Sequence, residues 1–193
     1  MSRLGYDALE AAWQALPASP TSEGRVVHLV MRHSVSQLAK RDRPPGYNVL
    51  RSPYHTEPRQ VTLDPVEGIV GDRWSPEKNN PGDQISLTNI AVTRLITNGD
   101  PARFHLTGDN FIVDFDVTAK TLPVGTKLAI GTAVIEITED SYRPCNRYEA
   151  RFGKDARRWA DDPIHVGRHI RGRYAKVVSG GTVELGASIT RVG

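Results

Sequence analysis

The sequence has one cysteine, Cys145, among its 193 residues. A single thiol cannot form an intramolecular disulfide, so nothing in the sequence indicates an oxidising compartment. No apolar run approaches the ~20 residues of a membrane-spanning helix. The N-terminal segment lacks the apolar core of a signal peptide and carries Asp7, Glu10 and Glu23. These absences predict a cytoplasmic protein that does not cross a membrane.

Several common site motifs are absent too. The sequence has no CxxC, HExxH, GxGxxG, GxSxG or Walker loop. His165 and His169 are four residues apart, but Gly167 and Pro163 disfavour a stable helix between them. We interpret them as two loop histidines, with a zinc site as the less favoured alternative.

The net positive charge of the chain is concentrated in one segment. The net charge is +3, but residues 143–176 hold ten Lys or Arg against four Asp or Glu. Arginine suits bidentate recognition of phosphate or carboxylate, although a solvated basic face is the alternative. Interleaved aromatics and a helix-turn-helix pattern are missing, which argues against nucleic acid as a partner.

Short apolar segments recur about every ten residues and are separated by glycine turns. The predicted strands are RVVHLVMRH, QISL, FIVDFDV, the hairpin KLAIGTAVIEIT with its Gly131-Thr132 turn, and three strands within RYAKVVSGGTVELGASITRVG. Between the first two, QVTLDPVEGIVGDRW is rich in apolar residues and ends in a turn at Gly71-Asp72. This spacing favours a closed or nearly closed β-barrel over a βαβ fold.

Few helices are predicted. Residues 5–16 form one by their apolar spacing, and the linker PASPTSEG follows. We therefore divide the chain into a helical extension with linker, residues 1–24, and a barrel domain, residues 25–193, and expect the helix to pack on the outside or on a partner. Thr88 is predicted to cap a second helix that ends at Gly99, and GKDARRWADD to form a third. Residues 40–59 are predicted to be a long loop that covers the site.

Cys145 is the strongest candidate for chemistry. Arg143, Arg147 and Arg151 surround it, and Pro144 precedes it. Nearby guanidinium groups stabilise the thiolate, which is the nucleophilic and metal-binding form. The alternative is a buried structural cysteine, the commonest state of a free thiol.

Two further segments carry polar residues in turns. Asp109 and Asn110 stand between a glycine and an apolar strand in TGDNFIV, and Asp72 and Arg73 follow Gly71 in GIVGDRW. From local sequence alone, a structural turn is the favoured interpretation of both.

Five segments in order change this balance: VEGIVGDRW, DQISL, TGDN, LPVGTKLAIGTAVIEITEDSYRPC and RGRYAKVVSGGTVELG. Together they resemble the MOSC domain, named for the C-terminal domain of molybdenum cofactor sulfurase, in its stand-alone bacterial type. The resemblance spans roughly residues 25–191. It implies a mixed β-barrel of the pyruvate-kinase-barrel type with a few short helices.

The resemblance also implies site residues. Cys145 matches the family cysteine that carries sulfur or binds molybdenum, so it is the predicted catalytic and metal-binding residue. Arg73 matches the arginine of GDR, and Asn110 matches the asparagine of G-E-N. With Arg143 and Arg147 they are the predicted cofactor-binding residues.

Three functions follow as hypotheses. The first is a molybdenum-cofactor protein centred on Cys145, either an oxidoreductase that reduces N-hydroxylated compounds or a sulfur carrier, with an electron-donor or sulfur-donor protein as partner. The family also has an association with pyridoxal phosphate binding. The second is a non-catalytic module that binds a small anionic ligand or a partner protein and has a structural cysteine. The third, a nucleic-acid-binding protein, is the least favoured.

Overall fold

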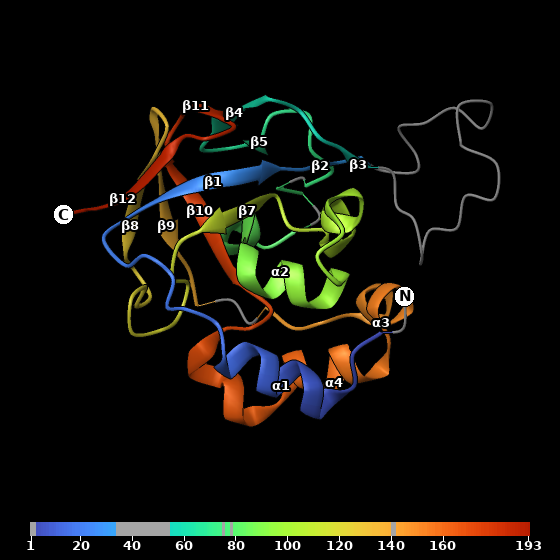
Figure 1. The fold of residues 1–193 in the computed structure, drawn as a ribbon. Helices are drawn as coiled ribbons and strands as arrows, with labels where there is room; N and C mark the ends of the chain where they lie inside the picture. The colour runs from blue at the N-terminus through green and yellow to red at the C-terminus, as the bar shows by residue number, and fades with distance from the viewer. Residues whose placement is uncertain (1–2, 34–54, 75, 78, 140–141) are drawn as a thin grey trace, which may run out of the picture.

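Seven strands close into a barrel in the computed structural model, which describes residues 3–33, 55–74, 76–77, 79–139 and 142–193 (Figure 1). Their order around the barrel is β1-β12-β8-β9-β10-β6-β7. The bounds are β1 Glu23–Leu29, β6 Ile85–Asn89, β7 Phe111–Asp114, β8 Lys127–Ile130, β9 Ala133–Ile137, β10 Arg173–Ser179 and β12 Ser188–Val192. β6 and β7 run parallel and every other neighbouring pair runs antiparallel. The predicted mixed β-barrel is confirmed.

Alternating side chains fill the barrel. In β9, Ala133, Ile135 and Ile137 are buried, whereas Val134 and Glu136 are half-buried. This period of two is the one that the sequence shows. Gly131 and Thr132 connect β8 to β9, and the φ of Gly131 is 59°, as the predicted two-residue hairpin requires.

Two small sheets flank the barrel. One has the order β11-β4-β5, with bounds Gly181–Glu184, Gln60–Asp64 and Gly68–Ile69. The other pairs β2, Met31–Arg32, with β3, His55–Thr56. Residues 40–54 of the predicted loop lie outside the described residues, while its last part contains β3. A short 3₁₀ turn, η3 (Pro81–Asp83), precedes β6.

A crossover joins the parallel strands β6 and β7, as this strand direction demands. It consists of α2, Ile90–Thr97, and the 3₁₀ helix η4, Pro101–Thr107. The Asn89 side chain caps α2 by accepting a hydrogen bond from the Ala91 N–H at 2.7 Å. The predicted cap at Thr88 was therefore one residue early, because Thr88 still pairs with Ile112 in the barrel.

The other helices pack together on one side of the barrel with α2 (Figure 1). They are α1 (Tyr6–Gln14), α3 (Asn146–Phe152), α4 (Lys154–Asp161) and the 3₁₀ helix η5 (Pro163–Arg168). Leu9, Val92, Phe152 and Trp159 belong to their shared hydrophobic core. This helical layer positions the start of α3, where Cys145 lies.

The N-terminal helix α1 packs against α4 and α2 of its own chain. Leu9 is buried, and the Glu10 carboxylate accepts hydrogen bonds from Trp159 Nε1 and Arg168, each at 2.9 Å. Burial alone would raise the pKa of Glu10, but these hydrogen bonds lower it to about 2. In the described ranges, every helix is too short or too polar to cross a lipid bilayer.

Gly172 allows β10 to approach β6 closely. Its φ is 109°, and a Cβ atom there would lie 2.1 Å from the Leu87 carbonyl oxygen. Gly172→Ala should therefore lower the free energy of unfolding by at least ~2 kcal/mol, measured by denaturant titration. Gly99→Ala is the matched control. The φ of Gly99 is 73°, and a Cβ atom added there would have no atom of the described residues within 4 Å apart from its chain neighbours, so only backbone strain of about 1 kcal/mol is expected. Equal losses in the two variants would refute the steric argument.

Candidate functional site

Cys145 lies at the N-terminal end of α3 and is exposed. Its backbone is extended, with φ −96° and ψ 176°, and the chain becomes helical at Asn146. The thiol lines a pocket of about 130 Å³, which we call the Cys145 pocket. The Pro144-Cys145 pair thus ends an extended segment and presents the thiol at a helix start.

Arginines dominate the lining of the Cys145 pocket. They come from β2, the turn after β5, the segment before α3, α3 itself and the connection from η5 to β10. The six are Arg32, Arg73, Arg143, Arg147, Arg151 and Arg171. Among the described lining residues there is no aspartate or glutamate. The pocket is therefore suited to an anion.

Two of these arginines are neutralised by buried carboxylates behind the pocket wall. Arg171 donates to both Asp109 oxygens, at 2.8 and 2.9 Å. Arg32 donates to Asp72 Oδ1 at 2.9 Å. Burial alone would raise the pKa of Asp72, but the charge and hydrogen bonds of Arg32 hold it below its ordinary value. Each pair fixes its guanidinium because a buried charge without a partner is costly.

The other arginines leave the pocket positively charged. Arg143 is exposed and lies 3.5 Å from Asp161. For Arg73, Arg147 and Arg151, no carboxylate of the described residues forms an ion pair. Burial and then the neighbouring guanidinium groups lower the pKa of Arg151 to about 10, although the Cys145 thiolate opposes that change.

The pKa of the Cys145 thiol lies below its ordinary value. Burial alone would raise it, but the first-turn backbone N–H groups of Tyr148 and Arg147 lower it. The charges of Arg171 and Arg151 lower it further. A helix N-terminus and nearby cations are the surroundings of reactive cysteines. The side chain is therefore poised as a nucleophile or a soft ligand rather than as a core thiol.

Three buried polar atoms around the pocket have no hydrogen-bond partner in the part of the chain that the structure describes: Tyr148 Oη, Arg151 Nε and Arg171 Nε. Buried polar atoms in proteins are nearly always hydrogen-bonded. The Arg171 guanidinium is already held by stacking, since its Cζ lies 4.0 Å from the Tyr142 ring centroid and 5.0 Å from that of Tyr148. The unsatisfied atoms are donors that an anionic ligand beside Cys145 would satisfy.

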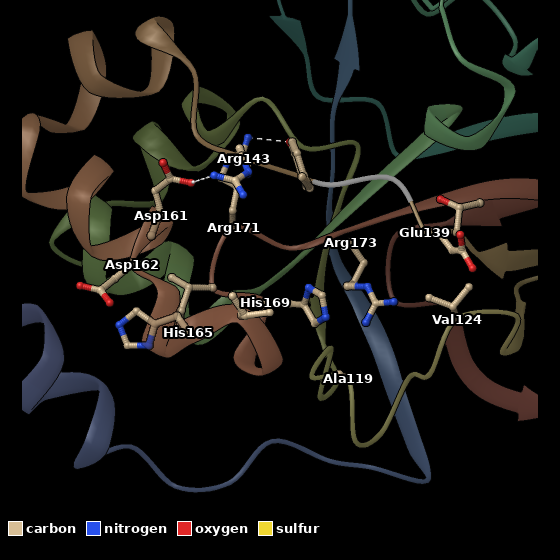
Figure 2. A pocket seen from close by; sticks show the side chains of 15 residues that line it. Ala119, Val124, Glu139, Arg143, Asp161, Asp162, His165, His169, Arg171 and Arg173 are labelled. Atoms are coloured by element: carbon tan, nitrogen blue, oxygen red, sulfur yellow. Dashed lines mark hydrogen bonds and ion pairs between the residues drawn. The ribbon is translucent and has the colours of Figure 1, made fainter.

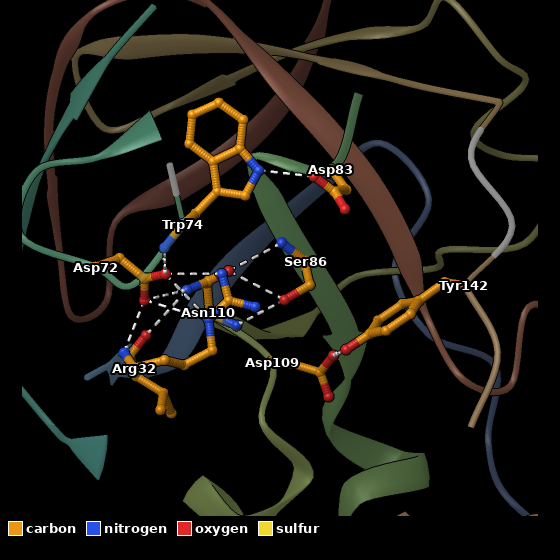
Figure 3. A network of polar contacts seen from close by, with 9 residues as sticks. Arg32, Asp72, Trp74, Asp83, Ser86, Asp109, Asn110 and Tyr142 are labelled. Atoms are coloured by element: carbon orange, nitrogen blue, oxygen red, sulfur yellow. Dashed lines mark hydrogen bonds and ion pairs between the residues drawn. The ribbon is translucent and has the colours of Figure 1, made fainter. Parts of the chain in front are cut away.

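Asn110 lies directly before β7, in the buried network below the pocket (Figure 3). Its Oδ1 accepts from the N–H and Oγ of Ser86 at 3.1 and 3.0 Å. Its Nδ2 donates to Val30 O at 3.3 Å and to Asp72 Oδ2 at 3.2 Å. The amide is thus engaged by protein groups, and it orients the carboxylate that holds Arg32.

The structure brings four of the five sequence-predicted site residues into one pocket: Cys145, Arg73, Arg143 and Arg147. Asn110 is absent from the described lining and contacts it through Asp72. Among the lining residues that sequence reasoning did not select are Arg32, Tyr142, Tyr148 and Arg171. The signal for two of them was available, because Asp72 and Asp109 next to apolar strands each require a cation once buried.

A second pocket adjoins the first. It has a volume of about 300 Å³, and we call it the Arg173 pocket (Figure 2). The two pockets share Tyr142, Arg143 and Arg171. His165 and His169 both line it, but His165 Nε2 lies 3.1 Å from the Glu10 carboxylate. In the described ranges, no three His, Cys, Asp or Glu side chains are grouped as metal ligands.

The thiol pKa gives a test by alkylation. The rate of Cys145 carboxymethylation should rise with pH with a midpoint below that of a free thiol, about 8.5. Arg151→Met should raise this midpoint because it removes a nearby positive charge. Arg143→Met is the control, since Arg143 is exposed and is not among the groups that shift the thiol most. A wild-type midpoint at or above that of a free thiol would contradict the electrostatic argument.

Comparisons with known proteins agree with the barrel fold. A family model for the MOSC domain matches residues 66–190. Three crystal structures are similar. A hypothetical protein has a TM-score of 0.57 and 15% sequence identity, and the match covers 88% of this chain and 69% of that one. YiiM from Geobacillus stearothermophilus has a TM-score of 0.55 and 14% identity, with coverages of 88% and 75%, and the YuaD protein from Bacillus subtilis has a TM-score of 0.53 and 19% identity, with coverages of 86% and 94%. These structures support the fold. A comparison with curated proteins gave no match. Because the family model covers more than half of the chain, the protein belongs to the MOSC domain family.

Proposed function

We propose that this protein binds a molybdenum–pterin cofactor through the Cys145 thiolate and acts as an oxidoreductase on N-hydroxylated compounds. The observation that carries the proposal is an exposed thiol of lowered pKa in a pocket of six arginines with three unsatisfied buried donors. The MOSC family is associated with molybdenum-cofactor proteins, which agrees with this chemistry.

The types of residue in the Cys145 pocket suit such a cofactor. A thiolate is a soft ligand of the kind that a molybdenum centre accepts. Since the described residues contain no cluster of metal ligands, Cys145 would be the protein ligand, and the pterin would supply the others. Arg73, Arg143 and Arg147 would hold its phosphate. The described lining has no lysine for a Schiff base, which favours this cofactor over pyridoxal phosphate.

The bound cofactor would supply oxygen-atom removal: an N-hydroxylated compound becomes the amine and water as two electrons and two protons are consumed. Those electrons require a donor protein as partner. The chain's own residues have simpler tasks. The first turn of α3 lowers the pKa of Cys145, and Asp72 and Asn110 hold Arg32 in place. The buried donors of Tyr148 and Arg171, which have no partner among the described residues, would orient an anionic group beside the sulfur.

Sulfur carriage is the second candidate, and the size of the pocket favours it. About 130 Å³ is small beside the ~300–1,000 Å³ of typical ligand pockets. A single additional sulfur on Cys145 fits in that space, and the surrounding arginines would keep a persulfide anionic. A sulfur-donor protein would then be the partner.

Metal and pterin content test the proposal. Protein from a molybdenum-replete source that makes the cofactor should contain about one molybdenum and one pterin per chain, and Cys145→Ser should lose both. The variant's melting temperature should stay close to wild type, because the thiol is exposed.

Molybdenum retained in the serine variant would overturn the proposed ligand. Absence of metal from both proteins, together with cyanide-releasable sulfur in the wild type alone, would favour sulfur carriage. Absence of metal and sulfur, with a thiol inert to alkylation until unfolding, would favour the non-catalytic binding module.

A further inference from the structure

The Arg173 pocket contains a charge that the proposed chemistry does not use. Arg173 begins β10, and its side chain lies in the pocket beside His169 (Figure 2). Only 4% of the residue is exposed. Arg173 Nη1 donates a hydrogen bond to the Leu122 carbonyl oxygen at 2.9 Å.

Arg173 lacks the counter-charge that similar arginines have. Among the described residues, Asp109 neutralises Arg171 and Asp72 neutralises Arg32, but no carboxylate forms an ion pair with Arg173. Burial lowers the pKa of Arg173. A buried charge without a partner is unfavourable. A ligand that carries a negative charge would provide the missing partner of Arg173.

His169 provides a second polar group beside Arg173. Burial, and then the charge of Arg173, lowers the pKa of His169 to about 4. The imidazole is therefore neutral near pH 7 and offers one N–H donor without another charge. His169 has a left-handed backbone with φ 48° at the end of η5, and its side chain lines the same cavity as Arg173.

The charges around the pocket define the ligand. Arg143 and Asp161 offset each other, and Asp162 accepts hydrogen bonds from Tyr6 at 2.6 Å and from the Ile164 N–H at 3.0 Å. Glu139 is exposed at the pocket. Arg173 therefore remains as the buried positive charge of the pocket, and the carboxylates of Glu139, Asp161 and Asp162 disfavour a dianion.

We propose that the Arg173 pocket binds the carboxylate of a small, partly apolar molecule, with Arg173 and His169 as its hydrogen-bond donors. A guanidinium fork matches the two oxygens of a carboxylate. Val124, Val166 and Ile170 line the pocket and provide apolar contacts for the rest of the molecule. The volume of about 300 Å³ is enough for an aromatic acid.

The position of this site gives it a role in substrate choice. Because the Arg173 and Cys145 pockets share Tyr142, Arg143 and Arg171, a molecule held by its carboxylate at Arg173 would extend toward the thiol. This part rests on the proposed function: the substrate class would be N-hydroxylated compounds that carry a carboxylate. The binding of the carboxylate itself does not depend on it.

Isothermal titration calorimetry with benzoate tests the site. Benzoate should bind wild-type protein, and benzamide, which has the same shape without the charge, should bind at least about tenfold more weakly. Arg173→Met should weaken benzoate binding by a similar factor. Its melting temperature should be unchanged or raised, because an unpaired buried charge is removed.

The matched control is Lys120→Met, which removes an exposed positive charge next to the pocket-lining Ala119 and should leave benzoate binding unchanged. Arg173→Lys guards against misfolding of the methionine variant: it keeps the charge, loses the fork, and should bind benzoate more weakly than wild type. The His169 imidazole NMR signals should shift on benzoate addition in wild type and in Lys120→Met alike.

Benzoate affinity that is equal to wild type in Arg173→Met or Arg173→Lys would overturn the proposal. Preference for inorganic phosphate over benzoate would overturn it in favour of a phosphoryl site, such as one for the cofactor's own phosphate. Cys145→Ser should bind benzoate as wild type does, so failure of molybdenum loading and failure of this site are separate outcomes.

Discussion

The buried ion pair between Arg171 and Asp109 connects the barrel to the segment that carries the thiol. Asp109 belongs to the turn before β7, and Arg171 to the connection into β10. Tyr142 joins them, because its hydroxyl group contacts Asp109 and Arg171 and its ring stacks on the guanidinium. Breaking a buried pair by removing one partner typically costs about 3–5 kcal/mol. Asp109, Tyr142 and Arg171, which are far apart in the sequence, are thus held together, and Tyr142 lies three residues before Cys145.

Around this pair, arginines that have a carboxylate partner serve a structural role, whereas arginines without one can bind a ligand. The charges of Arg32 and Arg171 are neutralised by the buried carboxylates of Asp72 and Asp109, and both arginines serve as rigid parts of the pocket. Arg73 and Arg147 have no carboxylate partner among the described residues, so their charge remains available to a ligand. The same distinction identifies Arg173 in the adjoining pocket. In a low-dielectric interior, an uncompensated cation is costly enough to indicate what the site is built to bind.

The helical layer contributes to function through position rather than through chemistry. α3 begins directly after Cys145, and the backbone N–H groups of its first turn lower the pKa of the thiol. The hydrophobic core that α3 shares with α1, α2 and α4 fixes the direction of that first turn. α1 is held in this layer by the buried Leu9 and by Glu10. The N-terminal helix α1 therefore stabilises the helical layer that positions Cys145.

Sequence alone predicted the barrel strands, the Gly131-Thr132 hairpin and the helices α1, α2 and α4, because alternation of apolar residues and turn chemistry are local properties. The mixed character of the barrel was implied by the family resemblance, and α3, η4 and η5 were not predicted. Sequence alone also identified Cys145 and its neighbouring arginines, which lie within a few residues of each other. Tertiary structure decided which arginines are neutralised, that Asn110 lies in a buried network rather than in the described lining, and that Arg32, Arg171 and Arg173 border the two pockets. Those facts depend on distances between residues far apart in the chain. The burial that makes a charge costly, and the partner that offsets it, exist only once the barrel has closed.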